Sequence, residues 1–180
     1  YRASAALSLS ASDGDAVPAG STIATLSGNK REILTVERAA LNLVGRLCGI
    51  ATRTRQFVDA MNQGGPVRAR LFDTRKTTPG LRMLEKYAVR CGGGLCHRIG
   101  LFDAVLIKDN HLAGVGLDRL AEVIAAASRA ARESHPGLQF VEVEVDSLEQ
   151  LERVLTLDAG LVDIVLVDNM GPEQLRQAVT

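Results

Sequence analysis

Beyond residue 66 the sequence alternates between strand-like and helical runs, and this alternation constrains the fold more than any other feature. The strand-like runs lie at 67–72, 104–107, 140–145 and 163–168, and the helical runs lie at 81–91, 117–133, 147–156 and 172–179. Repeated strand-helix units are typical of a parallel sheet covered by helices. Because so few units cannot close a (β/α) barrel, the sequence predicts an α/β fold that is either an open sheet or an incomplete barrel.

Short β segments and one long helix precede the alternating part. Turn residues at Gly14-Asp15 and Pro18-Ala19-Gly20 separate the β segments, and residues 21–26 are predicted to form a strand. Apolar residues then recur at helical spacing from about 36 to 62, with Thr35 as a candidate N-cap. We therefore expect a domain boundary near residue 35.

The charges of the chain balance overall but not locally. The sequence has 21 basic and 21 acidic residues, yet residues 67–111 carry nine Lys/Arg against four Asp/Glu, and residues 112–180 carry five against twelve. A neutral protein of this kind is not expected to bind nucleic acid or a membrane surface. The local excess of cations instead predicts a small anionic ligand.

The three cysteines, Cys48, Cys91 and Cys96, show neither a disulfide framework nor the spacing of a zinc site, which fits a reducing cytoplasm. No apolar run approaches the length of a membrane span, and the beginning of the sequence does not resemble a secretory signal. The absence of an initiating Met leads us to expect a fragment.

The polar run at 73–80 carries adjacent Arg75 and Lys76, and further cations follow at Arg98 and Lys108. A guanidinium fork matches a carboxylate or a phosphate, and an ammonium adds a compact charge. This combination suits a ligand with two or more anionic groups, although a set of surface ion pairs is the alternative. His97 is either a binding residue or a structural hydrogen-bonding residue.

Charged residues also end the later strand-like runs. Lys108 could clamp a phosphate, form a Schiff base or be simply exposed. Glu142 and Glu144 share one face of their strand, so one of them is expected beside Asp168, which ends the next strand. Two carboxylates together with ligand phosphates form the kind of site that Mg²⁺ prefers. Helix capping by Asp168, or a buried ion pair, is the alternative.

Several long motifs follow one another in order: Glu37-Arg38, then the motifs at 47–52, 73–77, 86–94, 97–98, 107–111, 142–145 and 168–169. Together they resemble the quinolinate phosphoribosyltransferase family, also called nicotinate-nucleotide pyrophosphorylase (carboxylating), over nearly the whole chain. The resemblance implies that residues 1–35 form the C-terminal part of an N-terminal α/β sandwich domain. It implies that residues 36–180 form an incomplete α/β barrel that carries the catalytic residues and is truncated at its C-terminal end.

The resemblance also implies an activity: transfer of phosphoribose from phosphoribosyl pyrophosphate to quinolinate, with decarboxylation to nicotinate mononucleotide, in the biosynthesis of NAD. It implies a cytoplasmic homodimer or higher oligomer, with Mg²⁺ as the only cofactor and Arg38 reaching the partner's site. Five residues match the quinolinate pocket, namely Thr74, Arg75, Lys76, His97 and Arg98. Lys108, Glu144 and Asp168 match residues that line the phosphoribosyl pyrophosphate side of the site. Glu144 and Asp168 are also implied to bind Mg²⁺, partly through water and substrate phosphates. The implied catalytic residues are Lys76, Lys108, Glu144 and Asp168.

Three other functions remain open at this point. A sister group of molybdenum-transport-associated, pyrophosphorylase-like proteins shares much of the pattern and has an uncertain substrate. A Schiff-base aldolase would use Lys108. A lipoyl-like binding module is suggested by the glycines and apolar residues of 14–26, but no lysine lies at a hairpin tip there. The family also continues beyond the end of this sequence with glycine-rich turns that bind the ribose phosphate, so we expect part of the active site to be missing.

Overall fold

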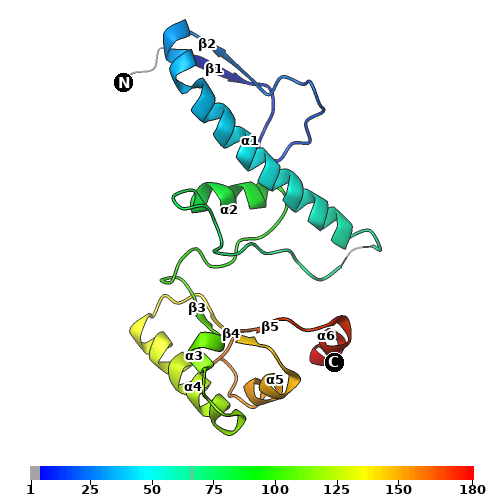
Figure 1. Ribbon diagram of the computed structural model, residues 1–180, viewed down its shortest axis with the longest axis vertical. Coiled ribbons are helices and arrows are strands. Elements are labelled where there is room, and N and C mark those ends of the chain that lie inside the picture. Colours follow the sequence, from blue (N-terminus) through cyan, green and yellow to red (C-terminus); the bar gives the residue numbers. More distant parts are fainter. Residues whose placement is uncertain (1–4, 66) are drawn as a thin grey trace. The chain divides into compact units, whose positions relative to one another are not determined.

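The computed structural model describes residues 5–65 and 67–180 (Figure 1). The chain forms two compact units, Tyr1–His97 and Arg98–Thr180. The first four residues of the predicted sandwich segment, and Pro66, lie outside the described residues. None of the helices in the described part of the chain has the length and apolar character needed to cross a membrane.

The first unit contains a hairpin and two packed helices (Figure 1). Strands β1 (Ala6–Leu9) and β2 (Ala24–Ser27) pair antiparallel, with Ala6 opposite Ser27. They are followed by α1 (Lys30–Met61) and α2 (Arg82–Cys91), which pack against each other. The loop of the hairpin reaches α2, because the hydroxyl of Tyr87 donates to a carboxylate oxygen of Asp13 at 2.6 Å.

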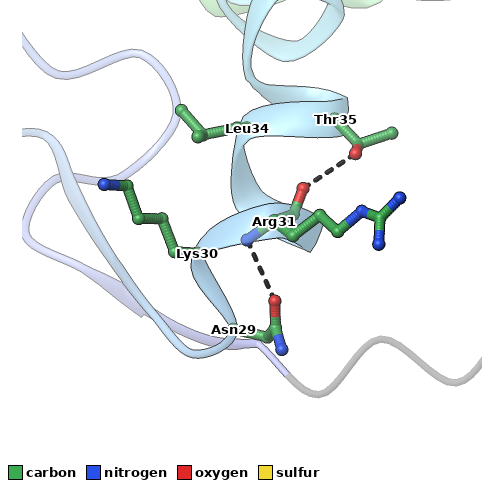
Figure 2. Close-up of a pocket in the computed structure, with 5 residues that line it drawn as sticks. All are labelled: Asn29, Lys30, Arg31, Leu34 and Thr35. Carbon is green, nitrogen blue, oxygen red and sulfur yellow. Dashed lines mark hydrogen bonds between the residues drawn. The ribbon is translucent and has the colours of Figure 1, made fainter.

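Helix α1 begins earlier than the sequence indicates. Its N-cap is Asn29, whose side-chain oxygen accepts the backbone N–H of Arg31 at 2.9 Å, and not Thr35 (Figure 2). The hydroxyl of Thr35 instead donates back to the carbonyl of Arg31 at 2.8 Å. The prediction of Thr35 as the cap is wrong because Asn29 already satisfies the free N–H groups of the first turn. The helix therefore runs through the boundary expected near residue 35, and the domain division itself stays a prediction.

The C-terminal end of α2 lies very close to α1. Gly92 follows α2, and a Cβ atom built on it would lie 2.4 Å from the carbonyl oxygen of Ala51 and 2.6 Å from the Cβ of Thr54. Thr54 is buried on α1, and its hydroxyl donates to the carbonyl of Ile50 at 2.9 Å. The backbone of Gly92 thus occupies the space that a side chain would need.

The strand predicted at 67–72 does not form among the described residues. Only Phe72 pairs, in an isolated parallel bridge with Leu95. Residues 67–70 are exposed, so burial does not favour an extended ladder there. Two hydrogen bonds flank the bridge, from Leu95 N–H to the Leu71 carbonyl at 2.8 Å and from Asp73 N–H to the Leu95 carbonyl at 3.0 Å.

The second unit is built on a three-stranded parallel sheet with the order β3-β4-β5 (Figure 1). In chain order its elements are β3 (Val105–Ile107), α3 (Asp109–Leu112), α4 (Leu117–Ser134), β4 (Val141–Val145), α5 (Leu148–Leu155), β5 (Ile164–Val167) and α6 (Pro172–Ala178). The strands and the longer helices agree with the predicted ranges within one or two residues, and α3 is an additional short helix.

Strand β4 lies at the centre of this sheet. Its residues Val141, Val143 and Val145 are fully buried and pack with apolar residues of α4 and α5. The ladder continues one residue beyond β5, because the N–H of Asp168 donates to the carbonyl of Val145, the last residue of β4, at 2.8 Å. The residues that follow each strand therefore lie at one edge of the sheet.

Two glycine substitutions should have opposite effects on stability. Gly92→Ala should lower the free energy of unfolding by roughly 1–3 kcal/mol, because the added methyl group meets backbone and side-chain atoms of α1. Gly45→Ala should raise it by roughly 0.5–1 kcal/mol, because Gly45 is in the interior of α1 and a Cβ there meets nothing within 4 Å. Urea denaturation of both variants measures this, and equal effects would contradict the close approach.

Candidate functional site

The cationic loop, residues 73–80, connects the Phe72 bridge to α2 and is shaped by its threonines. The hydroxyl of Thr74 accepts the N–H of Lys76 at 3.1 Å, and the Arg75 carbonyl accepts the N–H of Thr77 at 2.9 Å. Short turns of this kind are typical of Ser and Thr side chains. They place Arg75 and Lys76 side by side on a tight turn.

The side chains of Arg75 and Lys76 have no protein partner among the described residues. Neither makes an ion pair or hydrogen bond to another described side chain or backbone group, and the Nε of Arg75 is buried without an acceptor. A buried donor without an acceptor is costly, so such a group normally has a partner in the working protein. The alternative of surface ion pairs therefore has no support at these two residues.

The backbone of His97 is fixed by two charged side chains. One carboxylate oxygen of Asp73 accepts the N–H of His97 at 2.8 Å, and the ammonium of Lys86 donates to the His97 carbonyl at 3.1 Å. The same two side chains form an ion pair at 2.6 Å. The structure therefore joins His97 to the first residue of the cationic loop.

Cys96 lies beside this ion pair and is not activated. Its thiol contacts the carbonyl of Lys86 at 3.5 Å. Burial, followed by the negative charge of Asp73, raises the pKa of Cys96. Because the thiolate is the nucleophilic form, a raised pKa agrees with the absence of a role for Cys96 in the chemistry.

The far end of the cationic loop is held by Glu85 of α2. Its carboxylate accepts the N–H of Thr78 at 3.2 Å and the Nε of Arg46, from α1, at 2.7 Å, and Arg46 also donates to the hydroxyl of Thr78 at 2.5 Å. Burial alone would raise the pKa of Glu85, but the hydrogen bonds from Thr78 and Arg46 and the charge of Arg46 lower it overall. Glu85 is therefore a stable anion at neutral pH.

Arg38 lies on α1 and is exposed. No hydrogen bond or ion pair connects its side chain to another residue in the described part of the chain. The first unit thus brings Thr74, Arg75, Lys76 and His97 together, whereas Arg38 is not part of that group.

In the second unit, Arg98 is positioned by the segment that follows it. Its guanidinium donates to the carbonyl of Ala104 at 3.1 Å. Asp103 closes the intervening turn, accepting the N–H groups of Ile99 and Gly100 at 2.7 and 2.9 Å. Arg98 is half-buried in this arrangement.

Lys108 follows β3 and is held by a histidine. The Nδ1 of His111 accepts the backbone N–H of Lys108 at 3.1 Å, and the N–H of His111 donates to the Lys108 carbonyl at 2.8 Å. The ammonium lies 3.7 Å from a carboxylate oxygen of Asp109, and the side chain is 39% exposed. Through these bonds His111 caps the N-terminal end of α3, a role that residue type and spacing alone do not indicate.

Glu144 lies close to both Lys108 and Asp168. Burial raises the pKa of Glu144, the neighbouring Asp168 charge raises it further, and Lys108 partly opposes them. Glu142, its neighbour on the same strand face, is buried, and Asp168 is exposed. Of the two glutamates considered, Glu144 is nearer to Asp168 along the ladder, because it pairs with Leu166 whereas Glu142 pairs with Ile164.

The residue after Asp168 has an unusual backbone conformation. Asn169 has a φ of 57°, which places it in the left-handed region that Asn tolerates better than other side chains. It turns the chain sharply at the end of β5, immediately after the carboxylate. Sparsely populated conformations of this kind are frequent at binding sites.

Comparison with known proteins assigns the chain to a family. Sequence models of quinolinate phosphoribosyl transferase match it twice, the N-terminal domain at residues 3–48 and the C-terminal domain at residues 50–180. The chain belongs to the quinolinate phosphoribosyl transferase family. The predicted family is thereby confirmed, and membership leaves the aldolase and lipoyl-like alternatives without support.

Relatives in this family are similar over most of the chain. A probable nicotinate-nucleotide pyrophosphorylase [carboxylating] from Synechocystis is 46% identical over 94% of the chain and 53% of that protein. The nicotinate-nucleotide pyrophosphorylase [carboxylating] of Mycobacterium leprae is 46% identical over 93% and 54%. The chain therefore spans about half the length of the curated relatives it matches.

Solved structures of the family share the fold. NadC from Streptococcus pyogenes superposes with a TM-score of 0.83 at 44% identity, over 97% of this chain and 58% of that one. The nicotinate-nucleotide pyrophosphorylase from Francisella tularensis gives 0.84 at 43% identity, over 98% and 58%. The predicted fold class, an incomplete α/β barrel of this type preceded by the β-rich end of a sandwich domain, is confirmed.

The sequence did not reveal the residues that hold the cationic loop. Asp73 and Lys86 belong to the motifs at 73–77 and 86–94 but receive no role from them, and the sequence singles out neither Glu85 nor Arg46. The helical spacing of Arg82, Glu85 and Lys86 on α2 was the available signal, because residues three and four apart share a helix face. Nothing in that spacing says that the face is covered.

Replacing Glu144 by Gln should stabilise the protein in a pH-dependent way. A carboxyl whose pKa is raised by folding loses its stabilising contribution as pH rises through the folded-state pKa, and the loss begins above the ordinary value of 4.5. Glu144→Gln should therefore have a higher Tm than the wild type at pH 8 and a similar Tm at pH 4. Thermal unfolding across this range tests it, with the exposed Glu152→Gln as control. A Tm difference independent of pH would contradict the environment described for Glu144.

Proposed function

We propose that this chain is the part of a quinolinate phosphoribosyltransferase that carries most of its substrate-binding residues. The reaction would transfer phosphoribose from phosphoribosyl pyrophosphate to the ring nitrogen of quinolinate and release CO₂, giving nicotinate mononucleotide and pyrophosphate for NAD biosynthesis. The observation that carries the proposal is the unpaired Arg75-Lys76 pair on a loop fastened at both ends. Family membership and the names of the relatives support it.

Quinolinate is assigned to the cationic loop and the residues around His97. A bidentate guanidinium matches a carboxylate, so Arg75 and Arg98 would each bind one carboxylate of the substrate. Lys76 would neutralise the remaining charge, and Thr74 and His97 would add hydrogen bonds. Fixing both carboxylates orients the ring nitrogen for attack, and orientation supplies much of the rate enhancement in a two-substrate reaction.

Phosphoribosyl pyrophosphate is assigned to Lys108, Glu144 and Asp168. Lys108 would bind the departing phosphates, while Glu144 and Asp168 would orient the ribose hydroxyls and stabilise the positive charge that grows on the ribose ring. Once the ring nitrogen is quaternary, loss of CO₂ leaves an electron pair on the adjacent ring carbon, and the positive charge of the nitrogen stabilises that carbanion. The decarboxylation therefore needs no base from the chain.

Magnesium fits this side of the proposed site with few protein ligands. Burial raises the pKa of Glu144 and the charge of Asp168 raises it further, and a cation would relieve the repulsion between the two carboxylates. No group of three or more His, Cys, Asp or Glu side chains suited to a metal occurs in the described part of the chain. Such a pair suits an ion that keeps waters and uses substrate phosphates, and bound Mg²⁺ would neutralise the charge of the pyrophosphate.

The proposal includes a homodimer or higher oligomer in which Arg38 serves the partner's site. Arg38 is exposed and unpaired among the described residues, as a residue that acts outside its own chain would be. A cytoplasmic location is proposed as well, since the three cysteines are free thiols.

The intact protein that contains this chain should convert quinolinate and not nicotinate, because nicotinate lacks the second carboxylate that the cations require. Arg75→Gln should lower kcat/KM for quinolinate by about 10- to 100-fold, the effect expected for one charged hydrogen-bonding group. Arg153→Gln, an exposed arginine of α5, is the matched control and should have little effect. Chromatography of the nucleotide product measures both rates, and equal use of nicotinate would refute the assignment.

Mixing two inactive variants should test the role of Arg38. Arg38→Ala and Arg98→Ala are each expected to be inactive in the intact protein. A mixed dimer would place both lesions in one site and leave the other site intact, so activity should return toward about a quarter of the wild-type value, because random exchange makes half of the dimers mixed. Native mass spectrometry verifies subunit exchange. Verified exchange without recovered activity would show that Arg38 does not act across subunits.

A further inference from the structure

The ion pair between Lys86 and Asp73 is almost completely enclosed. The ammonium of Lys86 lies 2.6 Å from a carboxylate oxygen of Asp73, and the two side chains are 4% and 7% exposed. By comparison, the Arg46–Glu85 and Arg132–Asp163 ion pairs each have at least one side chain that is 33% exposed or more. Burying two charges costs desolvation free energy, and apolar side chains of similar volume often serve stability equally well.

This ion pair does more than connect two side chains, because both partners also bind the backbone of His97. Asp73 accepts the His97 N–H at 2.8 Å, and Lys86 donates to the His97 carbonyl at 3.1 Å. Both polar backbone groups of one residue are thus held by one buried pair. Apolar side chains could fill the same space but could not hold those groups, so the charges fix a backbone position.

Glu85, the residue before Lys86 on α2, holds the other end of the cationic loop. Glu85 accepts the N–H of Thr78, and Arg82, one turn earlier, donates from Nε to the hydroxyl of Thr77 at 3.1 Å. One face of α2 therefore holds the loop at Asp73, at Thr77 and at Thr78. Between these points lie the two cations that have no protein partner.

Adjacent cations repel each other, and nothing in the described part of the chain neutralises Arg75 and Lys76. A loose loop would let them separate, and the ligand would have to supply the free energy to bring them back. A loop already held in the binding geometry removes that cost from the binding free energy. A buried set of hydrogen bonds is suited to this because its geometry is narrow.

We infer that Asp73 and Lys86 are positioning residues that set the separation between the cationic loop and His97, and so select a planar acid with two carboxylates. The inference rests on the proposed function and deepens it. Neither residue touches the substrate. They act through the backbone of His97 and through the start of the loop that carries Arg75.

The test is a pair of double variants in the intact protein. Asp73→Leu with Lys86→Met removes both charges together, so no buried charge is left unpaired, and it leaves the His97 N–H without its acceptor. Asp73→Asn with Lys86→Met keeps an oxygen for that N–H and loses only the donor to the His97 carbonyl. Calorimetry gives the Kd of quinolinate, and initial rates give the KM of phosphoribosyl pyrophosphate.

Asp73→Leu/Lys86→Met should raise the Kd of quinolinate by about 30-fold or more, and Asp73→Asn/Lys86→Met by about 5-fold, following the number of hydrogen bonds lost. The KM of phosphoribosyl pyrophosphate should change by less than about 3-fold in both, because the hydrogen bonds of Asp73 and Lys86 lie within the first unit, whereas Lys108, Glu144 and Asp168 belong to the second. A purely structural role would instead lower stability and the active fraction while leaving the Kd of the folded fraction unchanged.

Asp163→Leu with Arg132→Met provides the matched control. Asp163 pairs with Arg132 at 2.5 Å and accepts the N–H of Val141 at 2.7 Å, so it combines a cation and a backbone N–H as Asp73 does. It lies before β5, at the edge of the sheet opposite to Asp168. Its loss should reduce stability and leave the Kd of quinolinate within about 2-fold.

The outcomes separate the inference from the proposed function. A wild-type protein that does not bind quinolinate would contradict the proposed function, and the inferred selection of a dicarboxylic acid with it. A binding wild type with an unchanged Kd in a folded Asp73→Leu/Lys86→Met variant would overturn the inference alone. If that variant does not fold, an unchanged Kd in Asp73→Asn/Lys86→Met overturns it in the same way.

Discussion

The parallel pairing of β4 with β3 on one side and β5 on the other is the constraint on which the second unit depends. Because the three strands run in one direction, Lys108, Glu144 and Asp168 are all delivered to the same edge of the sheet. The register is fixed by burial of the three valines of β4. A shift of one residue would turn Glu144 toward the core and a valine toward the charged edge, which the hydrophobic core opposes.

Helix α2 plays the corresponding part in the first unit. Its polar face is covered by the cationic loop and not by water, which explains how Glu85 and Lys86 can be buried on a helix with an exposed opposite side. Burying charged side chains such as Glu85 and Lys86 to hold a loop of further cations costs stability. Proteins accept such a local cost mainly at functional sites. The unpaired Nε–H of Arg75 and the left-handed backbone of Asn169 are two further features that cost stability locally and lie among the candidate site residues.

The sequence predicted the regular elements of the second unit well, because its apolar periodicity and its strand lengths agree with the burial that the sheet provides. It failed where tertiary contacts decide. The run at 67–72 has strand propensity but only Phe72 pairs, and Thr35 resembles a cap although the helix already begins after Asn29, six residues earlier. Whether a strand-like run finds a neighbouring strand to pair with depends on the tertiary structure, so the local sequence pattern alone does not reveal it.

The site was predictable to a similar extent. Adjacent cations and strand-end carboxylates follow from residue types and spacing, and the expected proximity of Glu144 to Asp168 agrees with the environment of Glu144. The roles of these residues stay predictions. The buried Asp73–Lys86 pair was not predictable, because Lys and Asp are surface residues in most proteins and only the fold reveals that they are enclosed.

The continuity of α1 has a consequence for how this family can vary in length. Arg38 and Arg46 lie on the same uninterrupted helix, about 12 Å apart along its axis, and Arg46 is fixed against Glu85 and Thr78. Inserting or deleting one residue between them would rotate Arg38 by about 100° around the helix axis while Arg46 stayed in place. A change of length within this stretch would therefore redirect Arg38 relative to the contacts of Arg46, so the number of residues between the two arginines also sets the direction of Arg38.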